Sequence, residues 1–228
     1  MTEADRPRRS GAGHDADEAL TLGQAFAEFR RHRSPRLLLP VTAVAVGVRV
    51  LLGGWRRRDL GIAAAILGAE PFTEWLIHVF LLHFRPRTIA GRTVDPLVAR
   101  KHRDHHRDPR DAELVFVPLP VLRVALPAAV AGFALAERRV RPALTGIATS
   151  YAMLTTYEWT HFLIHSPYRP RHRPYRAIWR AHRLHHFRNE HYWFGVTMHL
   201  ADRVLRTYPE RDEVPLSPTA RTLGVDAA

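Results

Sequence analysis

The chain has 228 residues, enough for one domain built of several long elements, and a formal net charge of +12. It contains no cysteine, which excludes disulfides, thiolate-bound zinc, iron–sulfur clusters and a cysteine nucleophile. All but one of its 34 lysine and arginine residues are arginine, a balance that suits nucleic acid or the anionic face of a membrane. Any metal site in this chain must therefore use nitrogen and oxygen ligands.

The N-terminal region divides into a polar tail and a short amphipathic helix. Residues 1–20 are polar, and we expect them to be disordered. In the stretch 21–33, Thr21 and Gln24 have the spacing of a capping box, and the apolar residues that follow share one helix face. We expect this helix to lie along the cytoplasmic interface of a membrane.

Four long apolar stretches follow, at residues 37–55, 60–84, 114–136 and 143–165. Each has roughly the ~20 residues that cross the hydrocarbon core of a bilayer. Charged residues interrupt these stretches, as they would in a soluble core, but four such stretches exceed what a soluble chain of this length needs. We therefore predict an all-α integral membrane protein with four transmembrane helices in two hairpins.

The distribution of arginine and lysine predicts the orientation of these hairpins. The segment before the first apolar stretch carries seven such residues, the segment between the second and third carries eight, and the tail after the fourth carries eleven. The short connections 56–59 and 137–142 carry three each. Because basic segments stay in the cytoplasm, both termini and the central segment are expected on that side.

Two shorter helices are predicted in the basic segments. Asp95 and Pro96 form an N-cap and first-turn pair, and the helix they begin ends before Pro109. Pro174 opens a second helix over 175–187. These helices are expected to form a cytoplasmic cap, and a loose C-terminal tail is expected over 210–228.

Ten of the fifteen histidines fall into four groups at or just beyond the cytoplasmic ends of the predicted spans. Two groups end the second and fourth spans, and two lie on the shorter helices. The groups are His78 and His83; His102, His105 and His106; His161 and His165; and His182, His185 and His186.

The spacing of these histidines favours metal binding. Residues three or four apart share a helix face, so the groups spaced HxxxH and HxxHH can each direct imidazoles to one side. His78 and His83 are five apart, or ~140° on an ideal helix. They converge only if the helix bulges there, and otherwise they serve different ions. A weak repeat, "EWLIH" (74–78) and "EWTH" (158–161), suggests two halves that each supply five ligands.

Other functions fit the pattern less well. Nucleic-acid binding does not need histidines at ligand spacing, and a pH switch needs only one or a few. A divalent-metal binder or transporter in the membrane is the non-enzymatic alternative, but transporters place their ligands near the bilayer midplane. Ten histidines exceed one coordination sphere, which indicates two ions. Two irons with nitrogen ligands suit oxygen activation better than zinc hydrolysis, which uses three or four protein ligands.

The order HxxxxH, HxxHH, HxxxH, HxxHH, between about residues 70 and 209, resembles the membrane-bound fatty acid hydroxylase and sterol desaturase superfamily. The segments "HRDHHRDPRDAELVFVPLP" (102–120), "YEWTHFLIH" (157–165) and "HRLHHFRNEHYWFGVT" (182–197) are similar to segments of that family. The resemblance implies that residues 21–209 form such a domain, in which the ten histidines ligate the metals.

The implied activity is that of a di-iron oxygenase, which hydroxylates or desaturates a fatty acyl chain or a sterol-like lipid. Iron is the implied working metal, and zinc can occupy such a site in a purified or crystallised form. Dioxygen and a small ferredoxin- or cytochrome-type electron-transfer protein are the implied partners, together with the membrane and without nucleic acid. A carotenoid ring hydroxylase of the same mechanism is the alternative.

Four further residues are candidates for supporting the metal ligands. Glu74 and Glu158 precede motif histidines by four and three residues, so their carboxylates could accept an imidazole N–H. His191 and Asp202 are expected near the site or the substrate, with solvation the stronger expectation for His191. After "WFGVT", this chain keeps Asp202 but has Arg206 where glycine is usual in the family.

Overall fold

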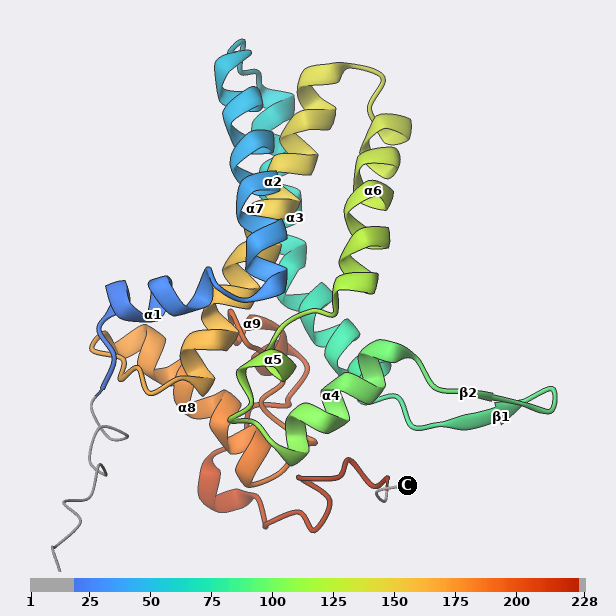
Figure 1. Ribbon diagram of the computed structural model, residues 1–228, viewed down its shortest axis with the longest axis vertical. Helices are drawn as coiled ribbons and strands as arrows, with labels where there is room; N and C mark the ends of the chain where they lie inside the picture. Colours follow the sequence, from blue (N-terminus) through green and yellow to red (C-terminus); the bar gives the residue numbers. More distant parts are fainter. Residues whose placement is uncertain (1–18, 226–228) are drawn as a thin grey trace, which may run out of the picture.

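A computed structural model describes residues 19–225 of the chain. The predicted N-terminal tail, residues 1–20, therefore lies almost wholly outside the described residues. Four long helices stand side by side as a bundle, and the shorter elements gather at one end of it (Figure 1). The bundle helices are α2 (Arg33–Leu51), α3 (Arg57–Leu76), α6 (Leu119–Ala136) and α7 (Val140–His165).

Three of the predicted spans correspond to helices that are long and apolar enough to cross a membrane. These are Arg33–Leu51, Arg57–Leu82 and Ala112–Ala136, the last joining α5 (Ala112–Val115) to α6. In the most apolar 18 residues of each helix, only 28%, 11% and 22%, respectively, are buried inside the protein. Apolar helices that leave so much of their surface uncovered are stable in lipid. The protein is therefore an integral membrane protein.

The fourth predicted span, residues 143–165, corresponds to α7, which is the central helix of the bundle. Its 26 residues are long enough to cross a bilayer, but within residues 19–225 it is not among the helices apolar enough to be a candidate span. Half of its residues are buried, and it packs against α2, α3 and α6 in the bundle and against α1 (Leu22–Phe29), α5 and α8 (Arg173–Phe187) at its C-terminal end. Tyr151, for example, is buried and donates its hydroxyl to the carbonyl oxygen of Leu126 on α6 at 2.7 Å.

A buried ion pair ties the bundle together at the end away from the shorter elements. Arg49, which interrupts the first apolar stretch, is 1% exposed and lies 2.9 Å from the carboxylate of Asp59. Its Nε also donates to the hydroxyl of Thr145 on α7 at 2.6 Å. The burial of this arginine is possible because its charge is paired with Asp59, while its Nε and Nη1 donate hydrogen bonds to Thr145 and to the carbonyl oxygen of Gly53.

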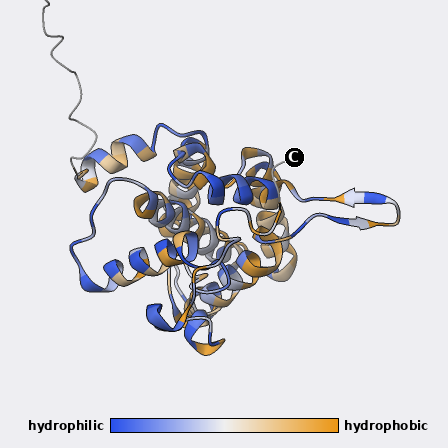
Figure 2. Ribbon diagram, turned by 90° about the horizontal axis from the view of Figure 1, so that it is seen from below, coloured by the Kyte–Doolittle hydropathy of each residue, from blue (hydrophilic) through white to orange (hydrophobic). Residues whose placement is uncertain are grey.

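The shorter elements form the second part of the molecule, which we call the head. It comprises α1 (Leu22–Phe29), α4 (Leu97–Arg107), α5, α8 (Arg173–Phe187), α9 (Leu200–Val204) and the 3-10 turn η2 (Arg211–Glu213). Viewed from the head end, hydrophilic residues alternate with hydrophobic ones along its outer helices (Figure 2). Buried aromatic residues of α1, of α7 and of the residue that follows α5 join the head to the bundle, among them Phe29, Phe162 and Phe116.

The predicted starts of the head helices are confirmed with one correction. α1 begins after Thr21, whose side chain forms the predicted capping box with Gln24. α8 begins at Arg173 with a proline in its first turn. The N-cap of α4 is Pro96 instead of Asp95, because the carboxylate of Asp95 is taken by Arg103 at 2.6 Å.

Two features of the head were not predicted. A β-hairpin projects from it, formed by β1 (Arg87–Ile89) and β2 (Arg92–Val94) around Ala90 and Gly91, which both have positive φ. In addition, residues 214–225, which were expected to be loose, pack against the head. Val214 and Leu223 are each 3% exposed there, because short apolar side chains and backbone hydrogen bonds hold this segment in place.

Candidate metal centre

All ten motif histidines come together in the head, where they form two neighbouring sets of five. Within each set, one nitrogen from every ring lies within 4.8 Å of those of the other four. The first set contains His78, His83, His102, His106 and His185. The second set contains His105, His161, His165, His182 and His186. The sets touch where the rings of His106 and His186 stack, with centroids 4.1 Å apart.

The two sets do not follow the two halves of the sequence, as the repeat suggested. His105 on α4 belongs to the second set, and His185 on α8 belongs to the first. The reason is helical geometry, because residues four apart point the same way while adjacent residues diverge by about 100°. Each HxxHH helix therefore gives its first and last histidine to one set and its middle histidine to the other.

The pairing of His78 with His83 depends on an irregular helix. Between them, α3 continues as the π-helical turn η1 (Ile77–Leu82), and the N–H of His83 bonds to the carbonyl oxygen of His78 at 3.1 Å. Hydrogen bonds from residue i to i+5 bring residues five apart to the same side. Of the two alternatives that the sequence left open, the structure has the bulge, and both histidines belong to the first set.

Backbone carbonyls fix the orientation of four of the rings. A carbonyl oxygen only accepts, so each of these Nδ1 atoms carries the hydrogen, and the lone pair of each Nε2 atom faces into its set. Such outward hydrogen bonds are typical of histidines that bind metals. The Nδ1 donors and carbonyl acceptors, 2.7 or 2.8 Å apart, are His78 to Phe194, His106 to Ala220, His161 to Val115 and His185 to Tyr192.

The spacing of the inward nitrogens fits metal binding. Five pairs of Nε2 atoms, each within one set, lie 3.0 to 3.2 Å apart. Two nitrogens bound to one ion at ~2.0–2.1 Å and at a right angle are also about 3 Å apart. In addition, the Nε2 atoms of His83 and His185 are buried and have no hydrogen-bond partner in the described part of the chain. The residues present therefore fit a pair of metal ions.

The head histidines are held in the neutral form that metals require. Burial lowers the pKa of His106 to about 3, although its hydrogen bond to Ala220 opposes the shift. Burial also lowers the pKa of the other histidines on α4 and α8 well below the usual value, and neighbouring histidines add to the shift. Because a neutral imidazole is the metal ligand, the rings need not lose a proton before they bind.

Within residues 19–225, no imidazole donates to the carboxylates of Glu74 or Glu158, which were candidates for that role. The buried carboxylate of Glu74 accepts from the backbone N–H of Val196 and from the hydroxyl and N–H of Thr197. The carboxylate of Glu158 accepts from the hydroxyl of Ser34 and from a backbone N–H after α5, at residue 117. Both carboxylates hold backbone segments near the site. The imidazole N–H groups that they were expected to accept donate to backbone carbonyl oxygens instead.

Asp202 acts on the site through the loop that precedes it. It is fully buried, and its carboxylate accepts from the N–H groups of Phe194 and Gly195 at 3.0 and 2.7 Å. This fixes the loop whose carbonyl at Phe194 orients His78. His191, in contrast, has a side chain that is 60% exposed, lies 3.4 Å from Glu190 and belongs to neither set.

Sequence reasoning missed the residues whose carbonyl oxygens orient the rings, namely Val115, Tyr192, Phe194 and Ala220. Every residue type carries a carbonyl, so these positions have no signature in the sequence. Gly195 is the one sequence signal in this loop. Its backbone passes so close to the carbonyl oxygen of Met198 that the Cβ of any other residue would clash with it.

Comparisons with known proteins agree with this site. A model of the fatty acid hydroxylase family matches residues 63–207, which contain all ten histidines. The dihydroceramide fatty acyl 2-hydroxylase FAH2 of Arabidopsis thaliana is 29% identical, over 77% of this chain and 72% of its own length. The fatty acid 2-hydroxylase of Rattus norvegicus is 32% identical, over 64% of this chain and 39% of its own length.

A solved structure shows the same fold. The hydroxylase domain of Scs7p superimposes with a TM-score of 0.65 and 23% sequence identity, over 81% of this chain and 68% of that one. The matched region of the family model covers well over half of the 228 residues. The chain therefore belongs to the fatty acid hydroxylase family.

Proposed function

We propose that this protein is a membrane-bound di-iron enzyme that hydroxylates a fatty acyl chain of a lipid at carbon 2. The relatives from Arabidopsis thaliana and Rattus norvegicus are named for fatty acyl and fatty acid 2-hydroxylation, which favours an acyl chain over a sterol-like lipid or a carotenoid. The same names favour hydroxylation over desaturation. The overall reaction places one oxygen atom of dioxygen in a C–H bond and reduces the other to water, with electrons from a small redox protein.

One observation carries the metal assignment: each of two sets of five histidines brings one nitrogen per ring within 4.8 Å of the other four, and carbonyl oxygens fix four of the ten rings. We assign one iron ion to each set, with its five histidines as ligands. When bound, the irons supply the activation of dioxygen. The chain itself holds the rings in neutral form, fixes their orientation and keeps water away from them by burial.

We further propose that the head and both termini lie on the cytoplasmic side, with α7 as a fourth span. The basic counts of seven, eight and eleven in the segments that meet in the head, against three in each far connection, support this orientation. Because the chain has no cysteine, single cysteines can report on it directly. An impermeant maleimide should label Arg138→Cys in intact cells and Arg92→Cys only after lysis. Labelling of Arg92→Cys in intact cells would contradict this proposal and place the head on the outer side of the membrane.

The activity is tested by comparing lipid extracts from a lipid-producing host by mass spectrometry. The host expresses the wild type, His185→Ala, or His191→Ala as a matched control, since His191 is exposed outside both sets. Wild type and His191→Ala should add one oxygen atom to acyl chains, and fragmentation should place it at carbon 2. His185→Ala should give extracts like those of the empty vector.

Other outcomes separate the alternatives. Loss of two hydrogens would indicate a desaturase, and an oxygen on a sterol-like lipid or a carotenoid would change the substrate. Extracts identical for all three proteins and the empty vector in several hosts, despite bound iron, would favour a metal binder over an enzyme.

A further inference from the structure

The two short basic connections meet at the end of the bundle opposite the head. The connection from α2 to α3 carries Arg56, Arg57 and Arg58, and the connection from α6 to α7 carries Arg138, Arg139 and Arg141. In Figure 1 these connections lie together at the top of the bundle, far from the histidines. Neither the metal centre nor the predicted orientation accounts for so many basic residues there.

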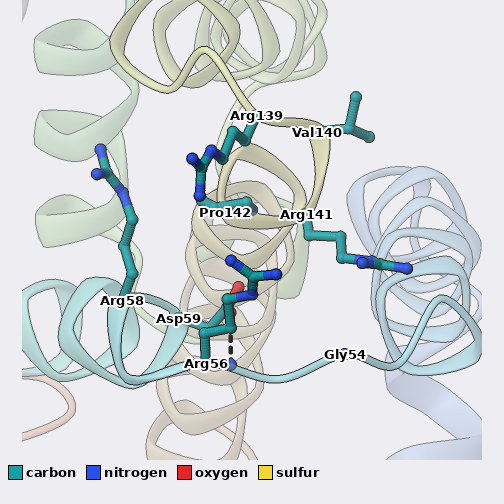
Figure 3. Close-up of a pocket in the computed structure, with 8 residues that line it drawn as sticks. All are labelled: Gly54, Arg56, Arg58, Asp59, Arg139, Val140, Arg141 and Pro142. Atoms are coloured by element: carbon teal, nitrogen blue, oxygen red, sulfur yellow. Dashed lines mark hydrogen bonds between the residues drawn. The ribbon is translucent and has the colours of Figure 1, made fainter.

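Arginines of both connections surround one pocket with a volume of about 520 Å³. Figure 3 shows side chains from the start of α3 and from the start of α7 on opposite sides of the same space. Its lining residues are Gly54, Arg56, Arg58, Asp59, Arg139, Val140, Arg141 and Pro142.

The positive charge of this pocket is not neutralised by the carboxylates around it. Asp59 is paired with the buried Arg49, and Glu137 is paired with Arg58 at 2.7 Å. Within residues 19–225, the guanidinium groups of the other three lining arginines, Arg56, Arg139 and Arg141, have no carboxylate within 4.0 Å. The three positive charges of these arginines therefore remain without a paired carboxylate in the pocket.

Two further features make the pocket suited to an anion. Both α3 and α7 begin at it, so the positive ends of two helix dipoles face the same space. Gly54 has a φ of +61°, and a Cβ there would lie 3.0 Å from Nη1 of Arg141. A side chain at residue 54 would therefore crowd this guanidinium.

We propose that this pocket binds a phosphate group, carried by the headgroup of an anionic phospholipid. Guanidinium groups bind phosphate through two parallel hydrogen bonds, which makes arginine better suited to it than lysine. The pocket lies at the end of helices that cross the membrane, which is the depth of the lipid headgroups. The proposal depends on the membrane helices alone and is independent of the metal and of the reaction.

Native mass spectrometry of the purified protein tests this site. Wild type is titrated with phosphatidylglycerol, with phosphatidylcholine and with inorganic phosphate. Arg139→Gln/Arg141→Gln removes two pocket arginines, and Arg57→Gln/Arg138→Gln removes the same charge from the same connections outside the lining. Arg139→Lys/Arg141→Lys keeps the charge without the paired hydrogen bonds, and circular dichroism with iron content confirms the fold of every variant.

We expect wild type to retain phosphatidylglycerol in preference to phosphatidylcholine. The glutamine pocket variant should bind it about 25-fold more weakly, from about fivefold for each arginine near a membrane surface. The lysine variant should fall between these values, and Arg57→Gln/Arg138→Gln should bind as the wild type does. Equal losses in both glutamine variants would overturn the proposal in favour of diffuse charge, as would equal retention of both lipids. Binding of inorganic phosphate with no retained lipid would overturn the lipid assignment.

Discussion

A carbonyl oxygen selects which nitrogen of a histidine is available to a metal. Phe194 does this for His78, and Asp202 in turn holds Phe194 through its N–H. Thr207 completes the arrangement, because its hydroxyl donates to Asp202 at 2.6 Å and accepts from the indole of Trp75 at 3.0 Å. The orientation of one ring thus depends on residues that never contact it.

Gly195 allows this loop to close, and replacing it should weaken the metal site. In Gly195→Ala, the new Cβ would lie 2.1 Å from the carbonyl of Met198, so the loop must move and take the carbonyl of Phe194 with it. Disturbing such an outer hydrogen bond costs about 10- to 100-fold in metal affinity. We expect that loss in iron titrations, with the helix content unchanged.

Gly132→Ala is the control for this substitution. Gly132 lies in α6, and a Cβ there would meet nothing within 4 Å. The same change at this position should leave iron affinity unchanged and favour the helix by about 0.5–1 kcal/mol. Equal iron affinity in both variants would show that the loop at residue 195 does not position His78.

Arg206 occupies a backbone conformation that glycine adopts more easily. Its φ is 60°, in the left-handed region that side chains disfavour. A residue with a side chain in this region carries backbone strain of roughly 1 kcal/mol or more. Glycine removes the strain, but its greater freedom in the unfolded chain offsets part of the gain in stability. Arg206→Gly should therefore raise the free energy of unfolding by about 0.5–1 kcal/mol, measured by denaturant titration. Arg206→Ala loses the same charge but keeps the strain, so an equal gain from alanine would refute this cause.

At the scale of elements, α4 and α8 serve both histidine sets at once. Each carries a first and last histidine for one set and a middle histidine for the other. Removing one helix would therefore leave both sets incomplete. The interlocking explains why six histidines on these two short helices are almost completely buried.

The burial of these six histidines predicts a pH dependence of stability. Their folded pKa lies below the value of about 6.5 that histidine has in an unfolded chain. Below that pH the unfolded chain binds more protons, so the free energy of unfolding of the metal-free protein should fall as pH falls. The slope approaches about 1.4 kcal/mol per pH unit for each histidine. Above pH ~7 these groups contribute no slope.

Denaturant titrations of the iron-free protein between pH 8 and pH 5 measure this effect. In the double variant His182→Phe/His186→Phe, the free energy of unfolding should fall less between pH 8 and pH 5, since two buried titrating groups are gone. A free energy of unfolding that is level across this range would show that the six histidines become protonated in the folded protein.

The sequence made some of these elements predictable and left others hidden. The length of the apolar stretches identified the long helices, and the spacing of the histidines identified the ten rings that cluster. Both properties can be read from the sequence because they belong to side chains. The HxxHH spacing separates His105 and His185 from the other histidines of their helices, but how α4 and α8 pack decides that each of the two joins the set of the other helix. The hairpin around Ala90 was missed because alanine is a weak turn signal, although its φ is positive.

At the scale of the whole molecule, the C-terminal segment closes the head over the first set. The carbonyl of Ala220 accepts from His106 at 2.8 Å, and that of Val225 accepts from Arg107 at 2.9 Å. The N–H of Ser217 donates to the carbonyl at the end of α8, at residue 188. Residues 214–225 thus link α4 to α8, the two helices that both histidine sets share.

A chain that ends at Glu213 should therefore lose iron mainly from the first set. Without Ala220, the Nδ1 atom of His106 loses its acceptor, while no ring of the second set bonds to residues 214–225, the described part of the removed segment. Elemental analysis should give iron per chain that falls from two ions towards one, with the bundle helices retained by circular dichroism. Ala220→Gly keeps the carbonyl and should bind iron as the full chain does. Full iron content in the shortened chain would mean that packing within α4 alone orients His106, and equal loss from both sets would mean that the segment stabilises the head as a unit.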